Sequence, residues 1–388
     1  MASPDAAGDL RTADRSRTGP APDAARQGAG RNRPRIMKQM IGYYVHHHGD
    51  GHRQRALAIA SAAPRGMFTL IGTGLAGRTD DIACLDLPDD RLPMSDGFDG
   101  HDAALHRPDA LHYAPYHHEG VRSRIARLAG WIARERPSLI VVDVSVEIAM
   151  LARLAATPTV YVRLGGLRDD HAHLEAFRGA KALLAPFHQD LDDQQTAAWV
   201  RARTRFCPGL TAAGHDLPDE NRDTVLVVNG LGGADGNGDD LAAAARATPA
   251  LNWRVIGPVS PPGSVPDNLA LLGWVENAQA EIAAAGVVIG AAGDGLVNAV
   301  IATQRPFICL PQSRPFGEQA SKARRLAALE AAIVVDEWPH ASEWPALIAM
   351  ARALKPDALR RLHDPDGARH AAEFLVTTAQ EGMTRAPD

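Results

Sequence analysis

The chain has 388 residues, which suits two domains of ordinary size better than a single hydrophobic core. Apolar residues make up 45% of it and charged residues 22%, which is the composition of a globular protein. Its net charge of −5, without a basic stripe, argues against nucleic acid as a partner. No apolar run has the length of a membrane-spanning helix.

Residues 1–37 differ from the rest because they are rich in Ala, Asp, Arg, Gly and Pro and almost lack large apolar side chains. Such a segment cannot bury enough surface to fold, so we predict a disordered tail. It has no apolar centre of the kind that a signal peptide needs. The three cysteines, Cys84, Cys207 and Cys309, lie far apart without metal-type spacing. We interpret them as reduced packing residues of a cytoplasmic protein.

Apolar runs typical of buried strands alternate with helical patterns along the rest of the chain. In the first half, strands are predicted at residues 41–46, 68–72, 139–142, 159–162 and 183–184, and helices at residues 52–62, 122–136 and 147–155. In the second half, strands are predicted at residues 225–228, 254–256, 270–272, 287–289, 307–310 and 333–335, with a last helix at residues 368–380. This alternation predicts an α/β fold of two doubly wound, Rossmann-like domains, each with a parallel sheet covered on both faces.

A loop-like segment rich in turn residues separates the two halves and sets the predicted domain boundaries. We predict a first domain over residues 38–210 and a linker over residues 211–222. A second domain follows over residues 223–365, and residues 366–388 form a C-terminal helix and tail.

The first candidate site is the run Gly49-Asp50-Gly51-His52, directly after the first predicted strand, with Arg55 one turn later. Glycines let the backbone approach a ligand closely, and the helix that follows offers free N–H groups to an anion. The third glycine of the dinucleotide-binding fingerprint is missing. The alternative is a surface turn whose histidine caps the helix.

The second candidate is Asp143, which ends the predicted strand at residues 139–142. A carboxylate at the carboxyl end of a buried parallel strand faces the ligand crevice. The alternative is that Asp143 caps the next helix, a role that Ser145 could fill instead.

Two further Gly-rich loops follow strands of the second half. Residues 229–233 come after the strand at 225–228, and their small side chains suit a phosphate cradle or a flexible turn. Residues 290–295 come after the strand at 287–289 and are followed, one strand later, by Glu318 and Gln319. We expect Asp294 and the Glu318-Gln319 pair at the same edge of the sheet.

Taken together, these motifs resemble the nucleotide-sugar glycosyltransferases of the GT-B fold. The nearest relatives indicated are family 28, with the lipid-linked N-acetylglucosaminyltransferase of peptidoglycan synthesis, and the UDP-glycosyltransferases of family 1. Residues 49–52 resemble their N-terminal Gly-rich loop with its histidine, and residues 139–143 the strand whose aspartate pairs with it. Residues 272–275 resemble the segment that reads the base, and residues 290–319 the donor motif.

The resemblance implies sugar transfer from a UDP- or TDP-sugar to a hydroxyl acceptor, with inversion and without a metal. His52 would act as the catalytic base and Asp143 would orient it. The nucleotide-sugar would be a co-substrate, so no cofactor is expected. The donor-binding residues implied are Gly51, Gly230, Gly232, Gly233, Trp274, Val275, Gly293, Asp294, Gly295, Asn298, Glu318 and Gln319.

The chain departs from the family pattern at two donor-motif positions. Ala291 stands where the family has histidine or serine, and Ala299 stands where a glutamate holds the ribose. Asp294 or Asn298 would have to supply the ribose contact instead. Residues 49–55 also resemble the UDP-sugar hydrolase of pseudaminic acid synthesis, in which water attacks. A hydrolase or epimerase, or a non-catalytic nucleotide-sugar binder, are therefore the alternatives.

The acceptor side has weaker signals. Arg168, Asp169 and His171 follow the strand at residues 159–162, and we interpret them as acceptor contacts, with a solvated loop as the alternative. The histidines between residues 106 and 118 are too loosely spaced to indicate a metal site, so none is predicted. A lipid acceptor would bring the protein to a membrane surface as a peripheral partner.

Overall fold

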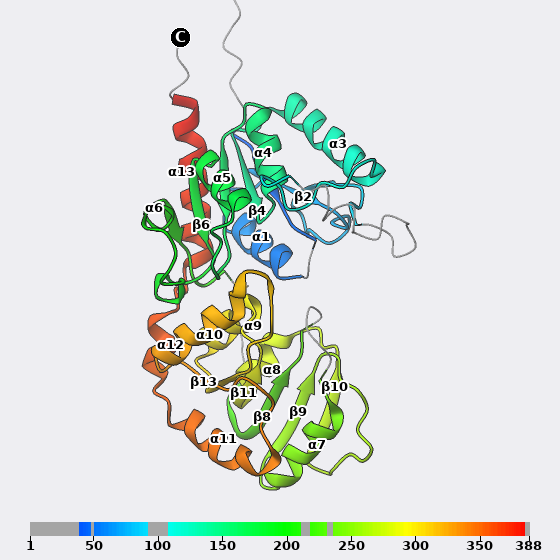
Figure 1. Cartoon of the computed structure of the whole chain (residues 1–388), viewed down its shortest axis with the longest axis vertical. Helices are drawn as coiled ribbons and strands as arrows, with labels where there is room; N and C mark the ends of the chain where they lie inside the picture. The colour runs from blue at the N-terminus through cyan, green and yellow to red at the C-terminus, as the bar shows by residue number, and fades with distance from the viewer. Residues whose placement is uncertain (1–38, 48–49, 92–107, 211–217, 231–235, 385–388) are drawn as a thin grey trace, which may run out of the picture. The chain divides into compact units, whose positions relative to one another are not determined.

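Two parallel β-sheets organise the chain, each covered by helices (Figure 1). The computed structural model describes residues 39–47, 50–91, 108–210, 218–230 and 236–384. The tail predicted at residues 1–37 and residues 211–217 of the predicted linker lie outside these ranges. Within residues Met37–Asp388 the chain forms one compact unit.

The first sheet contains seven strands in the order β3-β2-β1-β4-β5-β6-β7, and every neighbouring pair is parallel. The strands are β1 (Ile41–Tyr44), β2 (Phe68–Gly72), β3 (Ala83–Asp86), β4 (Leu139–Asp143), β5 (Thr159–Val162), β6 (Ala182–Ala185) and β7 (Thr204–Phe206). Strand order reverses between β1 and β4. In open α/β sheets this switch point opens a crevice at the carboxyl ends of the strands, where ligands bind.

Alternating side chains of this sheet pack into two separate cores. Tyr43 and Val141 join one core with α1 (Gly51–Ser61), whereas Tyr44 and Val142 join the other. The helices of the second core are α3 (Glu119–Glu135), α4 (Val146–Leu154) and α5 (His171–Gly179). The 3-10 helix η1 (Gln189–Leu191) and the short helix α6 (Ala198–Ala202) follow before β7. Burial on both faces explains why these strands read as continuous apolar runs.

The second sheet has six parallel strands in the order β10-β9-β8-β11-β12-β13, and its order reverses between β8 and β11. The strands are β8 (Asn221–Val228), β9 (Asn252–Ile256), β10 (Leu269–Gly273), β11 (Ala285–Gly290), β12 (Phe307–Cys309) and β13 (Ile333–Val334). Its helices are α7 (Gly238–Ala247), α8 (Ala278–Ala284), α9 (Asp294–Thr303), α10 (Glu318–Ala328), α11 (Trp344–Ala353) and α12 (Pro356–Arg361), with 3-10 turns η2 (Pro315–Gly317) and η3 (Ala341–Glu343).

The last helix, α13 (Gly367–Thr384), returns to the first sheet and is drawn in red in Figure 1. Its Ala371 and Leu375 belong to the same apolar core as Ile41 and Val141. No helix in the described ranges combines the length and apolar character that crossing a bilayer requires.

The predicted α/β fold class is confirmed, but in the first half the strands β3 and β7, the helices α5 and α6 and the 3-10 helix η1 were not predicted. Strand β3 is an edge strand with exposed or half-buried residues, so it lacks the apolar signature. Cys84 on this strand is exposed, which corrects its interpretation as a packing residue, whereas Cys207 and Cys309 are buried. Asp170 caps α5 by accepting a hydrogen bond from the His173 backbone N–H.

Candidate functional site

His52 and Asp143 meet at the switch point of the first sheet. Asp143 is the last residue of β4 and is fully buried, while His52 is the second residue of α1, which follows β1. The Nδ1 atom of His52 lies 3.0 Å from Oδ1 of Asp143, and 13% of the His52 side chain is exposed. The structure thus brings together the two residues that the sequence assigned to one strand edge.

The turn after β4 leaves the Asp143 carboxylate available for this contact. Ser145 caps α4, accepting a hydrogen bond from the Ile148 backbone N–H at 3.3 Å. Val144, between the two, has a φ of +57°, a left-handed conformation that costs a β-branched residue energy. The Tyr161 hydroxyl holds this turn by donating to the Val144 carbonyl at 2.6 Å. Helix capping by Asp143, the alternative reading, is therefore not observed.

Arg55 is the third member of the cluster, and its contact with Asp143 was not predicted. One turn after His52, its side chain lies on the same face of α1. Its Nε and Nη2 atoms donate to the Asp143 carboxylate at distances between 2.9 and 3.1 Å. Burial by itself would raise the pKa of Asp143, but the Arg55 guanidinium and His52 outweigh it and lower that pKa to about 2. Asp143 is thus a carboxylate throughout the physiological range.

The His52 ring can take two tautomers here, because its Nδ1 also lies 2.9 Å from Nη2 of Arg55. With a proton on Nδ1, the ring donates to Asp143 and leaves Nε2 able to accept a proton. With Arg55 donating to Nδ1 instead, Nε2 carries the proton and becomes a hydrogen-bond donor. The first arrangement suits a general base, and the second suits an anion contact.

The switch point of the second sheet carries the predicted Gly-rich loops. Val228 of β8 pairs with Gly290 of β11, so the loops after these strands start side by side. Gly293 is the N-cap of α9 and leaves the first N–H groups of that helix without a side-chain cap. A β-carbon added at Gly51, Gly230 or Gly295 would meet no described atom within 4 Å, so the backbone is open on that side. Gly232 and Gly233 lie outside the described residues.

Residues of α10 converge on the loop between β11 and α9. The ammonium of Lys322 forms an ion pair with Asp294 and donates to the Ala292 carbonyl at 3.3 Å. Gln319, the second residue of α10, accepts a hydrogen bond at Oε1 from the Gln312 backbone N–H at 2.8 Å. Burial opposes ionisation of Asp294, but Lys322, and then Arg55 and His52, lower its pKa. The charges of the two sheet edges therefore act on each other.

Asn298, a predicted ribose contact, and position 299, where the family has its ribose glutamate, face other groups. The Asn298 side-chain amide donates to the Pro186 carbonyl at 3.4 Å, and Ala299 packs into the apolar core under α9. A side chain at position 299 would therefore point into the core. A ribose role for Asn298 stays a prediction.

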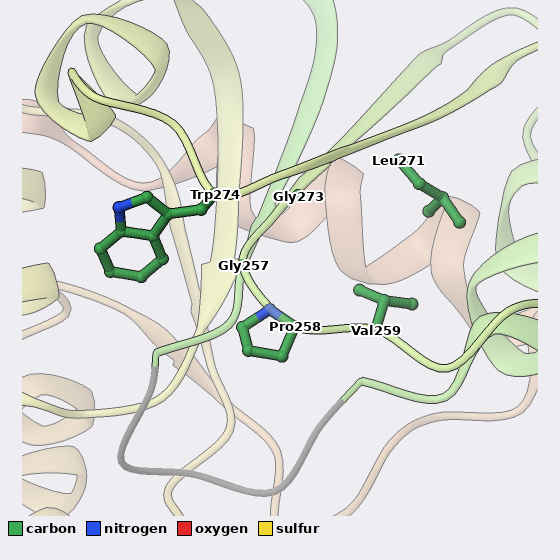
Figure 2. Close-up of a pocket in the computed structure, with 6 residues that line it drawn as sticks. All are labelled: Gly257, Pro258, Val259, Leu271, Gly273 and Trp274. Atoms are coloured by element: carbon green, nitrogen blue, oxygen red, sulfur yellow. The ribbon is translucent and has the colours of Figure 1, made fainter.

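A cavity of about 700 Å³ opens beside Trp274, at the carboxyl ends of β9 and β10 (Figure 2). The Trp274 side chain is 67% exposed and forms one wall, while Val275 packs against the core beneath. The volume is typical of small-molecule sites. The residues that line it are Gly257, Pro258, Val259, Leu271, Gly273 and Trp274.

Arg168, one of the three predicted acceptor residues, joins a contact between the two sheets' loops. It donates to Glu318 at 3.0 Å and stacks over the Phe316 ring, 4.7 Å from its centroid. Asp169 and His171 are exposed. Their acceptor role stays a prediction.

The backbones of these two loops also touch. The Leu167 N–H donates to the Phe316 carbonyl at 3.1 Å. Gly166 adopts a φ of +84°, and a β-carbon there would lie 2.5 Å from the Phe316 oxygen. Only glycine fits this approach.

His112, Asp170 and His173 form the group whose geometry comes nearest to a metal site within the described residues. Asp170 lies 2.8 Å from His112 Nε2 and 2.5 Å from His173 Nδ1. Two ligands of one zinc ion would be separated by about 3.3 Å, so these are direct hydrogen bonds. Burial and the neighbouring Arg168 lower the pKa of His173 to about 4, although Asp170 opposes this. The ring is therefore neutral at physiological pH.

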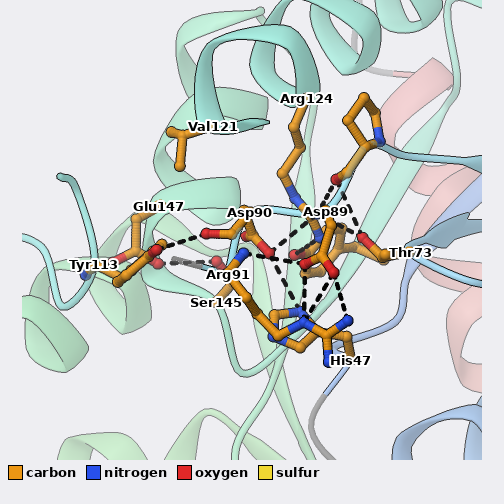
Figure 3. Close-up of polar contacts among 12 residues, drawn as sticks. His47, Thr73, Asp89, Asp90, Arg91, Tyr113, Val121, Arg124, Ser145 and Glu147 are labelled. Carbon is orange, nitrogen blue, oxygen red and sulfur yellow. Dashed lines mark hydrogen bonds and ion pairs between the residues drawn. The ribbon is translucent and has the colours of Figure 1, made fainter. Parts of the chain in front are cut away.

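A second polar cluster joins side chains from several segments of the first domain, among them β1, α3, α4 and the loops after β2 and β3 (Figure 3). The buried guanidinium of Arg124 donates to the hydroxyls of Tyr44 and Thr73, each at 2.7 Å, and lies 3.3 Å from Asp90. Glu147 accepts hydrogen bonds from the backbone N–H groups of residues 112 and 113. No sequence motif indicated this cluster, because its members come from distant segments.

Comparison with known proteins places the fold. No protein-family model matches the chain, and the search of curated proteins also gives no match. Among solved structures, CalG4, the calicheamicin glycosyltransferase, is 16% identical with a TM-score of 0.62, covering 91% of this chain and 100% of that one. The glycotransferase of kitacinnamycin is 14% identical with a TM-score of 0.60, covering 89% and 97%.

The glycosyltransferase VinC, solved in complex with DTDP, is also 14% identical with a TM-score of 0.60, covering 88% of this chain and 100% of that one. At such identities a structural likeness establishes the fold. The chain therefore has the GT-B fold, with two Rossmann-like α/β domains.

Proposed function

We propose that this chain is a glycosyltransferase that moves a sugar from a UDP- or TDP-sugar to a hydroxyl acceptor, with inversion and without a metal. The observation that carries the proposal is the 3.0 Å contact between His52 and Asp143 at the switch point of the first sheet. An imidazole with 13% of its side chain exposed and a buried, charged carboxylate form the arrangement of a general base and its orienting group.

In the proposed reaction, the acceptor oxygen forms a bond to the anomeric carbon while the bond from that carbon to the diphosphate breaks. The electron pair of the broken bond goes to the β-phosphate oxygen, and the acceptor proton goes to Nε2 of His52. Asp143 accepts the hydrogen bond from Nδ1 and stabilises the imidazolium that forms. Arg55 keeps Asp143 charged.

The donor is proposed to lie along the edge of the second sheet. VinC was solved with DTDP, which supports a nucleoside diphosphate in this fold. We place the base in the cavity beside Trp274 and Val275 and the diphosphate at the N-terminus of α9 near Gly293. Glu318 and Gln319 would hold the sugar, and Glu318 would exchange Arg168 for a sugar hydroxyl.

No cofactor is proposed beyond the co-substrate. A cytoplasmic location is proposed from the free thiols of Cys207 and Cys309, which are buried and unpaired with each other. The acceptor is proposed only as a hydroxyl compound. If it were a lipid, the protein would work at a membrane surface.

A nucleotide-sugar hydrolase is the second candidate, and the position of Arg55 favours it. In residues 49–55, the spacing of the histidine and the arginine resembles that in the UDP-sugar hydrolase of pseudaminic acid synthesis. Arg55 sits in the centre of the cluster, 2.9 Å from both His52 and Asp143. The same base could then activate water.

Release of nucleoside diphosphate from a panel of UDP- and TDP-sugars, measured with and without a panel of acceptor alcohols, tests both candidates. A transferase should release diphosphate faster with one class of acceptor and form a glycoside by mass spectrometry. Equal release in water alone would identify the hydrolase. Nucleotide binding without any release would instead indicate a non-catalytic binder.

A further inference from the structure

Lys322 is a buried cation that the proposed reaction has not yet used. Of the lysines that the structure describes, Lys181 and Lys355 are exposed, whereas only 4% of Lys322 is accessible. Withdrawing an ammonium from water costs several kcal/mol, and the gain from a buried ion pair often only balances that cost. Stability alone is therefore a weak reason for a lysine at this position.

The surroundings of Lys322 belong to the proposed donor site. Its Nζ pairs with Asp294, the first residue of α9, and lies 3.3 Å from the carbonyl of Ala292 in the loop before that helix. Its Cε is also within 3.8 Å of where a β-carbon on Gly165 of the first sheet's loop would lie. The ammonium is thus held where the loops of both sheets meet.

The spacing along α10 sets the distance from the sugar contacts. Lys322 follows Glu318 by four residues, so the two side chains lie on one helix face about 6 Å apart along the axis. A sugar bound by Glu318 would place its diphosphate about one helical turn away. Ala291 contributes no side-chain donor to this loop, which leaves Lys322 as a cation at the level of the diphosphate.

We infer that Lys322 binds the diphosphate of the nucleotide-sugar and stabilises the charge that develops on the leaving β-phosphate oxygen. The inference rests on the proposed function and names a residue for it. Without a bound donor, Asp294 neutralises the ammonium, and the phosphate of the donor takes over that hydrogen bond. Asp294 and the diphosphate also compete for the N-terminus of α9, because both are anionic.

Calorimetric titration with four probes, UDP, TDP, uridine and thymidine, tests this assignment. Lys322→Met should weaken binding of the tighter diphosphate by about 10- to 100-fold, the usual value of a charge-assisted hydrogen bond. Binding of its nucleoside should change less than about twofold, because no phosphate is present. Asp294→Asn should strengthen diphosphate binding by about 2- to 5-fold, since the competing carboxylate is removed.

Two controls separate binding from folding. Lys355→Met makes the same substitution at an exposed site, and should leave both affinities unchanged. The double variant Asp294→Asn/Lys322→Met removes both charges and leaves no unpaired ion buried, so it serves if Lys322→Met alone does not fold. In the double variant too, binding of the diphosphate should weaken more than binding of the nucleoside.

Equal weakening of diphosphate and nucleoside, or no weakening at all, would overturn the role of Lys322 while leaving the proposed function intact. If the wild-type protein bound neither nucleoside diphosphate, the proposed function itself would fail, and the role of Lys322 with it.

Discussion

Replacing Arg55 with methionine should destabilise the protein strongly, because it leaves the Asp143 carboxylate buried without its main counter-charge. The side chain of Asp143 has no exposed surface, and Arg55 donates three hydrogen bonds to it. Breaking a buried ion pair from one side costs about 3–5 kcal/mol of unfolding free energy. We expect a loss of that size at pH 7.

The pKa of Asp143 gives an independent magnitude. A shift from 3.8 to about 2 corresponds to about 2 kcal/mol in favour of the charged, folded form. Because the folded-state pKa is lowered, this stabilisation is present above about pH 4 and is lost as the pH falls toward 2. In Arg55→Met, burial opposes ionisation with less to offset it, so we expect a pKa above 3.8. The variant should then lose stability as the pH rises from 3.8 to the raised pKa of its buried Asp143.

Urea unfolding monitored by circular dichroism between pH 4 and pH 8 measures both effects. Arg122→Met is the matched control, since Arg122 forms an exposed pair with Glu119 and should contribute at most about 1 kcal/mol. Arg55→Met/Asp143→Asn should recover much of the loss, because the unpaired charge is gone. The reasoning is refuted if Arg55→Met is no less stable than Arg122→Met.

Three further predictions address the site. His52→Ala should lower turnover by about two to four orders of magnitude with little change in donor affinity, and normal turnover in initial-rate assays would exclude it as the base. Trp274→Ala should weaken UDP or TDP binding by about 1–3 kcal/mol if the base stacks on the indole; an unchanged titration would move the base elsewhere. The protein should lose up to about 3 kcal/mol of unfolding free energy as the pH falls from 6.5 to 4. The reason is that His173 takes up a proton more readily when unfolded, because its folded-state pKa is about 4. His173→Gln should flatten that part of the urea-midpoint profile, and a profile of unchanged slope would contradict the assignment.

Local patterns were enough to predict the strands that are buried on both faces and the edge on which His52 and Asp143 meet. Asp143 ends one apolar run and His52 follows another, and parallel strands end at one edge, so their proximity follows from topology. The edge strand β3 gave no such signal, because half its residues face solvent.

The ion pairs could not be predicted in the same way. Arg55 is 88 residues from Asp143, and Lys322 is 28 residues from Asp294. Such pairing depends on side-chain direction after the sheets have assembled, and no spacing rule encodes it. Arg55 was visible as a residue one turn after His52, but its partner was not.

The approach of Gly166 to Phe316 has a consequence for protein engineering. A fold of two such domains invites chimeras that join the first half of one protein to the second half of another. Here the backbones of the β5–α5 loop and the η2 turn are in contact. A foreign turn at residues 315–317 would therefore have to place a carbonyl where that of Phe316 accepts the hydrogen bond from the Leu167 N–H. A fusion made at the linker would inherit this junction as a mismatch. Grafting the β5–α5 loop together with the second half should preserve it.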